Sequence, residues 1–298
     1  MKIVITGSLG NISKPLAQTL VEKGHTITVI SSKAERQKDI EAIGAKAAIG
    51  TMNDAGFLTT TFKGADIVYV MEAIGYGSFF DHSIDVMETI KSIATGYKQA
   101  IEQSGVKRVV HLSSIGAHTD KGNGILAFHH LAESILGQLP ADVSIKFMRP
   151  VGFYYNMFAF IPTIKTQGVI VSNYGGDEKE PWVSPLDIAA VIAEEMEKPF
   201  EGRTIRYIAS DEQSPNEIAG ILGDAIGKPD LKWQMISNEQ LLNGMIAAGM
   251  NPQTAKGFVE MNASRQGVLY QDYFRHRPTL GRVKLKDFAK EFASGYNR

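Results

Sequence analysis

The residues with the clearest chemical signal stand at the start of the chain, in the run Ile5-Thr6-Gly7-Ser8-Leu9-Gly10-Asn11-Ile12-Ser13. A β-branched run precedes it and apolar residues at helical spacing follow, which is the setting of a dinucleotide-binding turn. Gly7 permits the tight turn, and Gly10 lets the backbone approach a pyrophosphate at the helix N-terminus. Ser13, at the third small position, departs mildly from the pattern, and an ordinary strand–turn–helix is the alternative. We predict that this turn holds a dinucleotide through Thr6, Gly7, Leu9, Gly10, Asn11 and Ile12.

The loop after the second expected strand reads Ser31-Ser32-Lys33-Ala34-Glu35-Arg36, and no acidic residue lies between Glu22 and Glu35. An NAD-specific site places Asp or Glu there to hold the ribose 2′-hydroxyl. Hydroxyl groups and cations suit a 2′-phosphate instead, because charge-assisted hydrogen bonds to phosphate are strong. We therefore predict a preference for NADP(H), with contacts from Ser31, Ser32, Lys33 and Arg36; a solvated loop is the alternative.

Further contacts are expected where other strands end, because ligands of open α/β sheets bind at the carboxyl ends of the strands. Asn53 follows the third expected strand and is a candidate for contact with adenine, although an Asn-Asp pair also suits a plain turn. Met71 and Glu72 follow the fourth strand and are expected on the ribose–nicotinamide side. Ser113 ends the fifth strand and Pro150 follows the sixth, and we add both to the predicted cofactor site.

The elements that must position these residues alternate in type along the first half of the chain. Nearly continuous apolar strands that alternate with amphipathic helices indicate a parallel sheet covered on both faces. We predict an α/β fold, with a doubly wound parallel sheet in residues 1–150 and a smaller C-terminal α/β lobe in residues 151–298. The expected strands are 2–6, 26–30, 45–50, 66–71, 106–113 and 144–148, and the expected helices are 14–23, 34–43, 83–104 and 124–136.

The second half is less regular, and no low-complexity linker or internal repeat separates it from the first. We expect it to return strands to the main sheet. Its expected strands are 168–172 and 204–210, and its expected helices are 186–196, 215–227, 238–248 and 284–293.

Composition excludes several other classes of protein. The 298 residues carry 31 basic and 32 acidic side chains, so no basic excess favours nucleic-acid binding. Without cysteine there is no disulfide framework, thiolate zinc site or cysteine nucleophile, and we expect a cytoplasmic protein. No apolar run approaches the roughly 18 residues of a membrane span, so no membrane partner is expected. His111 and His118 lack metal-ligand spacing with any carboxylate near them in sequence, so we predict no metal.

Several segments together resemble one known family over nearly the whole chain. They are the Thr-Gly-x-x-Gly turn, Val109–Ser114, the Arg149-Pro150-x-x-Phe153-Tyr154-x-Asn156 pattern, Trp182–Ala189 with its Asp-Ile-Ala sequence, and Lys284–Phe288. In these segments the chain is similar to the NmrA-like branch of the atypical short-chain dehydrogenases/reductases. The resemblance implies an NADP(H)-binding Rossmann domain, a small C-terminal lobe, and a pocket between them for a small molecule. Some members reduce quinones or other electrophiles, whereas others are nucleotide sensors that bind a regulatory protein. The resemblance also allows a homodimer, because some relatives dimerise through helices equivalent to 83–104.

The expected catalytic residues of the wider superfamily are missing. Its active members use Tyr-x-x-x-Lys on the helix after the fifth strand, but no tyrosine occurs here between Tyr97 and Tyr154. When Glu133 is aligned with the family glutamate, His129 takes the lysine position and Ile125 the tyrosine position. We predict His129 as the catalytic candidate, because an imidazole with a pKa near 6.5 suits proton donation or positioning of the ribose. A polar residue on a wet helix face is the alternative.

Aromatic residues gather in segments expected near the cleft, and such walls suit planar organic ligands. We predict substrate contacts from Phe79, Phe128, Phe153 and Tyr154, with core packing between the lobes as the alternative. The leading interpretation is an NADPH-dependent reductase of a small electrophile, such as a quinone. The alternative is a non-catalytic NADP(H) sensor that partners with a regulator.

Overall fold

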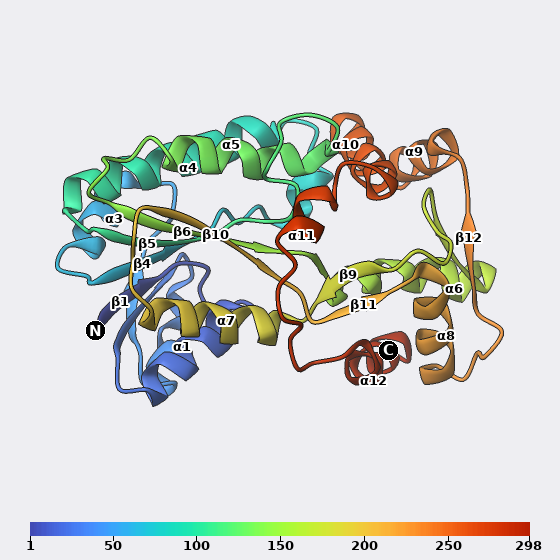
Figure 1. Cartoon of the computed structure of the whole chain (residues 1–298), viewed down its shortest axis with the longest axis horizontal. Helices are drawn as coiled ribbons and strands as arrows, with labels where there is room; N and C mark the ends of the chain where they lie inside the picture. Colours follow the sequence, from blue (N-terminus) through green and yellow to red (C-terminus); the bar gives the residue numbers. More distant parts are fainter.

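The computed structural model describes residues 1–298, and the side chains of all of them except Tyr76 and Gln266. A seven-stranded sheet forms its centre, in the order β10-β6-β5-β4-β1-β2-β3, and every neighbouring pair is parallel (Figure 1). This arrangement confirms the predicted doubly wound α/β class with its Rossmann strand order. The strands are β1 (Lys2–Ile5), β2 (Thr26–Ser31), β3 (Lys46–Ile49), β4 (Ile67–Val70), β5 (Arg108–Leu112), β6 (Ser144–Pro150) and β10 (Arg203–Ile208).

Helices cover both faces of this sheet, as its apolar strands require. On one face lie α1 (Ser13–Glu22) and α7 (Pro185–Glu197); on the other lie α3 (Ala55–Phe62), α4 (Val86–Ser104) and α5 (Ala127–Leu136) (Figure 1). Strand side chains alternate between the two cores: on β5, Val110 packs toward α1 and Val109 toward α4. Shorter segments near these elements are η1 (Ala34–Arg36), α2 (Gln37–Ala42), η2 (Tyr76–Phe79) and η3 (Gly124–Leu126).

The remaining chain builds two small sheets beside the main one. One has the order β11-β9-β7 and the other pairs β12 with β8. Their shared core is aromatic, with Trp182, Tyr154, Phe288 and Phe292 all buried. The strands are β7 (Gly152–Phe153), β8 (Val169–Ser172), β9 (Glu180–Val183), β11 (Asp211–Gln213) and β12 (Lys232–Met235); the helical segments are η4 (Tyr154–Phe160), α6 (Ile161–Gln167), α8 (Pro215–Ala225), α9 (Asn238–Ala247), α10 (Pro252–Ala263), η5 (Ser264–Gln266), α11 (Gln271–Arg275) and α12 (Leu285–Tyr296).

The chain crosses between the two parts more than once. It leaves the main sheet after β6, builds β7, β8 and β9, and returns as β10, which pairs with β6 from Arg203 opposite Ile145 to Ile208 opposite Pro150. The helix α7 from the second half also packs on α1. The division of the chain at residue 150 stays a prediction.

Some predicted boundaries are wrong for local reasons. The expected helix 83–104 begins at Val86, because Asp85 caps it by accepting a hydrogen bond from the Glu88 N–H at 3.1 Å. Ile84 therefore lies outside the helix. The expected helix 124–136 divides into η3 and α5. Four helices were not predicted: α3, α6, α10 and α11. Of these, α3 and α10 each begin after a capping side chain, Asp54 and Asn251 respectively.

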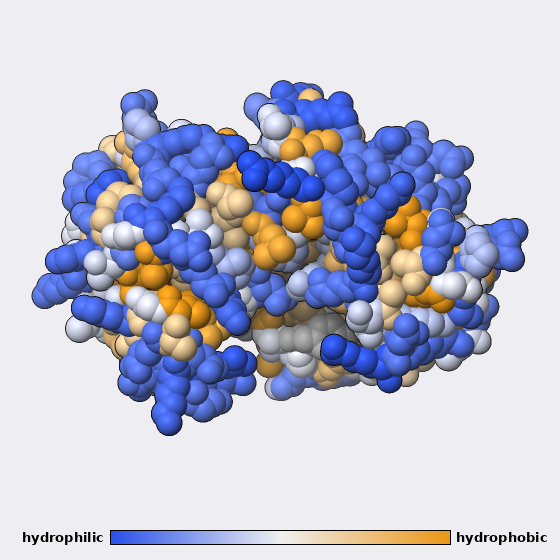
Figure 2. Space-filling model, turned by 90° about the horizontal axis from the view of Figure 1, so that it is seen from below, coloured by the Kyte–Doolittle hydropathy of each residue, from blue (hydrophilic) through white to orange (hydrophobic). Residues whose placement is uncertain are grey.

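The face of the molecule that Figure 2 shows is largely polar. On the face that Figure 2 shows, apolar side chains lie in several patches separated by hydrophilic ones. None of the described helices combines the length and the apolar character that crossing a membrane requires. Among the described residues, no three side chains of His, Asp or Glu are grouped as metal ligands would be.

Candidate functional site

The turn between β1 and α1 depends on a glycine at its first position. Gly7 has a φ of +86°, in the left-handed region that favours glycine. A Cβ atom added there would lie 2.6 Å from the Ser13 Oγ and 2.7 Å from the Met71 Sδ. At Gly10, whose N–H donates to the Gly7 carbonyl at 3.1 Å, an added Cβ would lie 3.1 Å from that same oxygen. The backbone of this turn is therefore exposed because neither position carries a side chain.

The N-terminus of α1 that follows has unused hydrogen-bond donors. The N–H groups of Asn11 and Ile12 donate to no acceptor among the described residues. Ile12 caps the helix without a side-chain acceptor, and the first turn holds no acidic residue. Ser13 directs its hydroxyl to the Thr6 carbonyl at 2.9 Å. The free amides and the positive end of the helix dipole fit an anionic group such as a diphosphate.

Side chains in this segment are divided between the core and the turn. Leu9 and Ile12 pack against the core, so only their backbones face the candidate site. Thr6 is buried, and its Oγ1 accepts a hydrogen bond from the Met71 N–H at 3.2 Å. Through that bond the end of β4 is fastened to the end of β1.

The loop after β2 is tied to the same turn. The Ser8 hydroxyl donates to the Ser31 Oγ at 2.9 Å, and the Lys33 N–H donates to that oxygen at 3.2 Å. Ser31 is buried, whereas Ser32, Lys33 and Arg36 are exposed. Arg36 lies 3.6 Å from the Asp39 carboxylate, and Lys33 has no carboxylate partner among the described side chains. Of these two cations Arg36 therefore has a carboxylate neighbour and Lys33 has none among the described side chains, and their contact with a phosphate stays a prediction.

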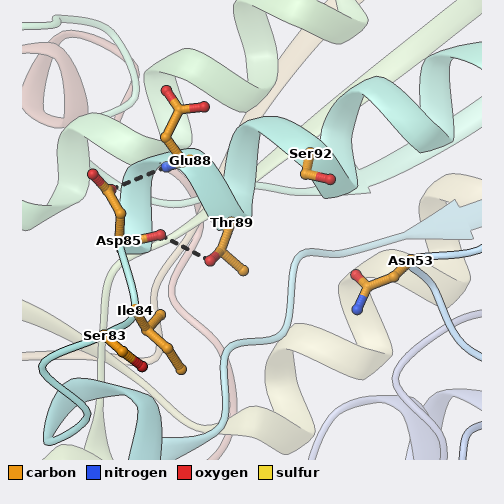
Figure 3. Close-up of a pocket in the computed structure, with 7 residues that line it drawn as sticks. All are labelled: Asn53, Ser83, Ile84, Asp85, Glu88, Thr89 and Ser92. Atoms are coloured by element: carbon orange, nitrogen blue, oxygen red, sulfur yellow. Dashed lines mark hydrogen bonds between the residues drawn. The ribbon is translucent and has the colours of Figure 1, made fainter.

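An open pocket of about 400 Å³ lies between the loop after β3 and the start of α4. In Figure 3 Asn53 stands apart from the six residues of the α4 side. On that side Asp85 is already occupied, because its carbonyl accepts a hydrogen bond from the Thr89 hydroxyl at 2.8 Å and its carboxylate caps the helix. The lining is otherwise polar: Asn53, Ser83, Ile84, Asp85, Glu88, Thr89 and Ser92. The contact of Asn53 with adenine stays a prediction.

The ends of β4 and β5 are joined by a buried ion pair that the sequence did not reveal. The Oε2 and Oε1 atoms of Glu72 lie 2.9 Å and 3.2 Å from the Nε2 of His111, and neither side chain has exposed surface. Burial by itself lowers the pKa of His111, but the Glu72 carboxylate more than offsets this and the net shift is upward. Glu72 therefore faces the interior, where it stabilises a positive charge on His111.

His129, the predicted catalytic residue, lies on α5 with its ring half-buried and 4.0 Å from the ring of Phe128. Its Nδ1 is buried and has no hydrogen-bond partner among the described residues. Burial lowers the pKa of His129 to about 3, with a smaller contribution from the charge of His111. This lowered pKa keeps the imidazole neutral at pH 7, and the catalytic role of His129 stays a prediction. The adjacent His130 has a structural contact, with its Nδ1 2.9 Å from the Ala117 carbonyl oxygen.

A second buried network occupies the ends of β5 and β6. The Ser113 hydroxyl donates to the Glu133 Oε1 at 2.5 Å, so it is already engaged. Arg149 binds both oxygens of Glu133, at 2.9 Å and 2.6 Å. Tyr207 donates to the Asp272 carboxylate at 2.6 Å, and Arg149 lies 3.3 Å from both of these groups. A buried arginine in a strand needs partners of opposite charge. The arginine in this apolar strand was therefore a sequence signal that a carboxylate such as that of Glu133 lies beside it.

Pro150 is also built into the sheet. It is buried, and its carbonyl accepts the Ile115 N–H at 2.8 Å. Contact of Ser113 or Pro150 with a cofactor stays a prediction, and their polar groups have protein partners already.

Of the four predicted substrate residues, Phe79, Phe128 and Phe153 are half-buried and Tyr154 is buried. Phe79 packs edge-on against Phe258 of α10 at 5.4 Å. Phe128 lies on α5 beside His129, and Phe153 is half-buried in β7 against the main core. Tyr154 corrects the expectation, because it is fully buried. Its hydroxyl donates to the Val283 carbonyl at 3.2 Å and its ring stacks on Phe288, so it belongs to the core of the second part.

The Asp-Ile-Ala segment has a structural role. Asp187 accepts a hydrogen bond from the Ser210 hydroxyl at 2.6 Å and from the N–H groups of Arg282 and Val283 at 3.2 Å and 3.0 Å. One carboxylate at the start of α7 thereby joins the segment before α12 to the residues that follow β10.

Comparisons with known proteins also indicate a protein that binds a nucleotide cofactor. The model of a family described as NAD(P)H-binding matches residues 7–199. The NAD(P)H azoreductase of Xenophilus azovorans is 24% identical over 262 residues, which cover 88% of this chain and 86% of that protein. The NADPH-dependent quinone oxidoreductase of Escherichia coli, solved with NADPH, has a TM-score of 0.80 and 19% identity over 97% of this chain and 99% of that one. The triphenylmethane reductase of Citrobacter sp. has a TM-score of 0.75 and 19% identity over 99% and 100% of the two chains.

Proposed function

This chain belongs to the NAD(P)H-binding family, in the NmrA-like branch of the atypical short-chain dehydrogenases/reductases, and on that premise we propose that it is an NADPH-dependent reductase of small electrophiles such as quinones. The observation that carries the proposal is the turn after β1, where the amides of Asn11 and Ile12 have no acceptor among the described residues, at a helix N-terminus without a side-chain cap. Those donors suit the diphosphate of a dinucleotide.

Residues of two neighbouring loops would complete the cofactor site. Lys33 and Arg36, exposed in the loop after β2, would give a ribose 2′-phosphate charge-assisted hydrogen bonds, and this supports NADP(H) over NAD(H). Asn53 lines the pocket that is open to an adenine. When bound, NADPH supplies a hydride from its nicotinamide ring.

The reductase chemistry must proceed without the usual tyrosine and lysine. Ile125 occupies the tyrosine position, and its aliphatic side chain has no proton to donate. It packs against Gly257 of α10. A quinone accepts hydride without a strong protein acid because its reduced oxyanion is delocalised. His129, neutral at pH 7, is suited to donate a hydrogen bond to that oxygen or to the ribose. The similar proteins, an azoreductase and a quinone oxidoreductase by name, support electrophiles of this kind.

Absorbance of NADPH at 340 nm tests the proposal against a panel of quinones. We expect turnover above the uncatalysed rate, and a reduced rate in Phe153→Ala, which removes a half-buried ring near the expected cleft. Phe274→Ala is the matched control, because Phe274 lies largely exposed on α11. Equal turnover in the wild type, Phe153→Ala and Phe274→Ala would show that Phe153 does not contribute to the site.

The competing function is a nucleotide sensor that binds a regulatory protein. The missing Tyr-x-x-x-Lys pair and the engaged Ser113 hydroxyl favour it. Tight binding of NADPH in calorimetry, together with no turnover across the panel, would replace the reductase by the sensor.

A further inference from the structure

One buried arginine in the second part of the molecule has unused hydrogen-bond donors. Arg265 lies in η5, between α10 and α11, and its side chain is only 8% exposed. Its Nη1 donates to the Glu180 carboxylate at 2.6 Å and to the Tyr270 hydroxyl at 2.7 Å. Its Nε is buried without a partner, and its Nη2 makes no hydrogen bond with any described residue. The edge of the guanidinium formed by Nε and Nη2 is therefore free.

Two other arginines show how this edge is used when a partner is present. In Arg149 the Nε and Nη2 donate to the two carboxylate oxygens of Glu133, at 2.9 Å and 2.6 Å. In Arg277 the same two atoms donate to the two oxygens of Glu212. Paired hydrogen bonds of this kind are among the strongest that a guanidinium makes. Because buried donors normally have acceptors, the free pair on Arg265 suits a bound molecule.

Aromatic rings and an ion pair hold the guanidinium of Arg265 in place. Its Cζ lies over the Tyr174 ring, 4.3 Å from the centroid, and over the Trp182 ring, 5.1 Å from the centroid. Both of these aromatic residues are buried, and the buried carboxylate of Glu180 fixes the Nη1 atom. The free edge is thus oriented before any ligand binds, which lowers the entropic cost of binding.

The free edge lies beside the chain that leaves the main sheet. A Cβ atom added at Gly152, in β7, would lie 3.9 Å from the Nη2 of Arg265 and 3.3 Å from the Trp182 ring. Gly152 comes two residues after the end of β6, at the edge where open α/β sheets bind their ligands. It also directly precedes Phe153, a predicted substrate residue. Glycine at this position keeps the space beside Nη2 free of a side chain.

The charges of the cluster favour a neutral ligand. Arg265 and Glu180 form a buried ion pair whose charges cancel. An anion bound beside them would leave a net negative charge in a buried site, which is costly. A carbonyl oxygen accepts hydrogen bonds without adding charge. The free edge therefore fits the oxygen of a ketone or a quinone better than a carboxylate.

We propose that Arg265 binds a carbonyl oxygen of the substrate through its Nε and Nη2 atoms, and that the substrate is a planar carbonyl compound such as a quinone. This inference rests on the proposed reductase function. A quinone that takes up a hydride gains two electrons and becomes the monoanion of the hydroquinone, and a proton from solvent completes the product. The guanidinium stabilises the negative oxygen of that monoanion more strongly than the neutral carbonyl.

Binding of menadione without NADPH tests the site in the absence of turnover. The chain has no cysteine that a quinone could alkylate, and a quinone at Arg265 lies close enough to Trp182 to quench its fluorescence. We expect saturable quenching in the wild type. In Arg265→Lys the dissociation constant should rise about tenfold to a hundredfold, because lysine keeps the charge beside Glu180 but lacks the paired donors. Arg277→Lys is the matched control and should keep the wild-type value, because Glu212 already occupies that edge.

Gly152→Ala tests the same site with the ion pair intact. Its methyl group occupies the space beside the Nη2 of Arg265, so the KM for menadione should rise about tenfold while the KM for NADPH is unchanged. Benzoate is the anionic probe, and we expect it to compete weakly with menadione. Tighter binding of benzoate than of menadione would overturn the assignment of a neutral ligand.

The possible failures are distinguishable. Equal dissociation constants in the wild type, Arg265→Lys and Gly152→Ala, or no saturable quenching in the wild type, would overturn this inference even where turnover is normal. A wild type that binds menadione through Arg265 but oxidises no NADPH with any quinone contradicts the proposed reductase function and leaves the carbonyl site in place. Circular dichroism of each variant separates a lost donor pair from a damaged fold.

Discussion

The turn after β1 and the ends of β5 and β6 lie at the same edge of the main sheet, yet they treat polar groups in opposite ways. In the turn, the amides of Asn11 and Ile12 have no acceptor in the part of the chain that the structure describes. At the ends of β5 and β6, Ser113, Glu133 and Arg149 satisfy one another at 2.5–2.9 Å. Free donors in an ordered turn suit a ligand, whereas a closed network of buried charges suits stability. The same position at a strand end therefore does not imply the same role.

Breaking the closed network should have the largest effect. Arg149→Met leaves the Glu133 carboxylate buried beside Ser113 without its charge partner. Loss of one partner of a buried ion pair typically destabilises a protein by about 3–5 kcal/mol. We expect a loss of that size in urea unfolding, with partial recovery in Glu133→Gln/Arg149→Met. Arg36→Ala, at an exposed position, should change stability by less than about 0.5 kcal/mol. A loss below about 1 kcal/mol in Arg149→Met would mean that the network contributes little.

Closing the open turn should affect binding and leave the fold intact. Gly10→Val places branched carbon atoms where even a Cβ lies 3.1 Å from the Gly7 carbonyl, so the side chain must occupy the approach of the diphosphate. We expect the Kd for NADPH in calorimetry to rise at least about a hundredfold, or roughly 2.7 kcal/mol. Unchanged circular dichroism would show that the variant is folded. Retained affinity in the folded variant would place the diphosphate elsewhere.

A smaller effect is expected from the loop that flanks the turn. Lys33→Ala with Arg36→Ala removes two cations that would meet a 2′-phosphate. Hydrogen bonds to charged groups contribute about 1.5–3 kcal/mol each, and exposure reduces this, so we expect NADPH affinity to fall roughly tenfold. Affinity for NADH, which lacks the phosphate, should be unchanged. An equal fall for both cofactors would attribute the effect to the loop as a whole.

A separate effect concerns the pH dependence of stability and two histidines, His111 and His129. His129 has a folded pKa of about 3, below its unfolded value near 6.5. The unfolded chain therefore binds an extra proton between these values, and His129 lowers stability as pH falls from 6.5 toward 3. The raised pKa of His111 acts oppositely, since its contribution is present below pH 6.5 and is lost as pH rises. His129→Asn should flatten the loss of stability between pH 7 and pH 5, measured by urea midpoints. An unchanged slope would mean that the imidazole is solvated.

The features that sequence predicts here are those that short stretches of chain determine. The glycine turn, the parallel strands and the missing Tyr-x-x-x-Lys pair each depend on residues within one segment. Most helices of the main sheet followed from apolar spacing in the same way. The helix α10 was missed because its pattern is interrupted by Gly257 and polar residues, and its burial depends on packing against η3.

Pairings between distant segments were not predictable from spacing. His111 was judged to lack a carboxylate near it in sequence, yet Glu72 lies 2.9 Å away because β4 and β5 are adjacent in the sheet. Tyr154 appeared equivalent to Phe153 in sequence. Only the structure shows that the Tyr154 ring enters the core and that Phe153 remains half-exposed. The pKa of His129 is likewise determined by its burial.

The return of the chain as β10 limits how this molecule can be divided. Cutting the gene after β6 would leave the hydrogen-bonding edge of that strand bare from Ile145 to Pro150, because β10 normally pairs with it. The same cut would remove α7 from its place over α1. An unpaired edge with uncovered apolar neighbours promotes association between molecules. A recombinant N-terminal fragment of this protein should therefore aggregate, and grafting experiments need to carry β10 with the nucleotide-binding strands.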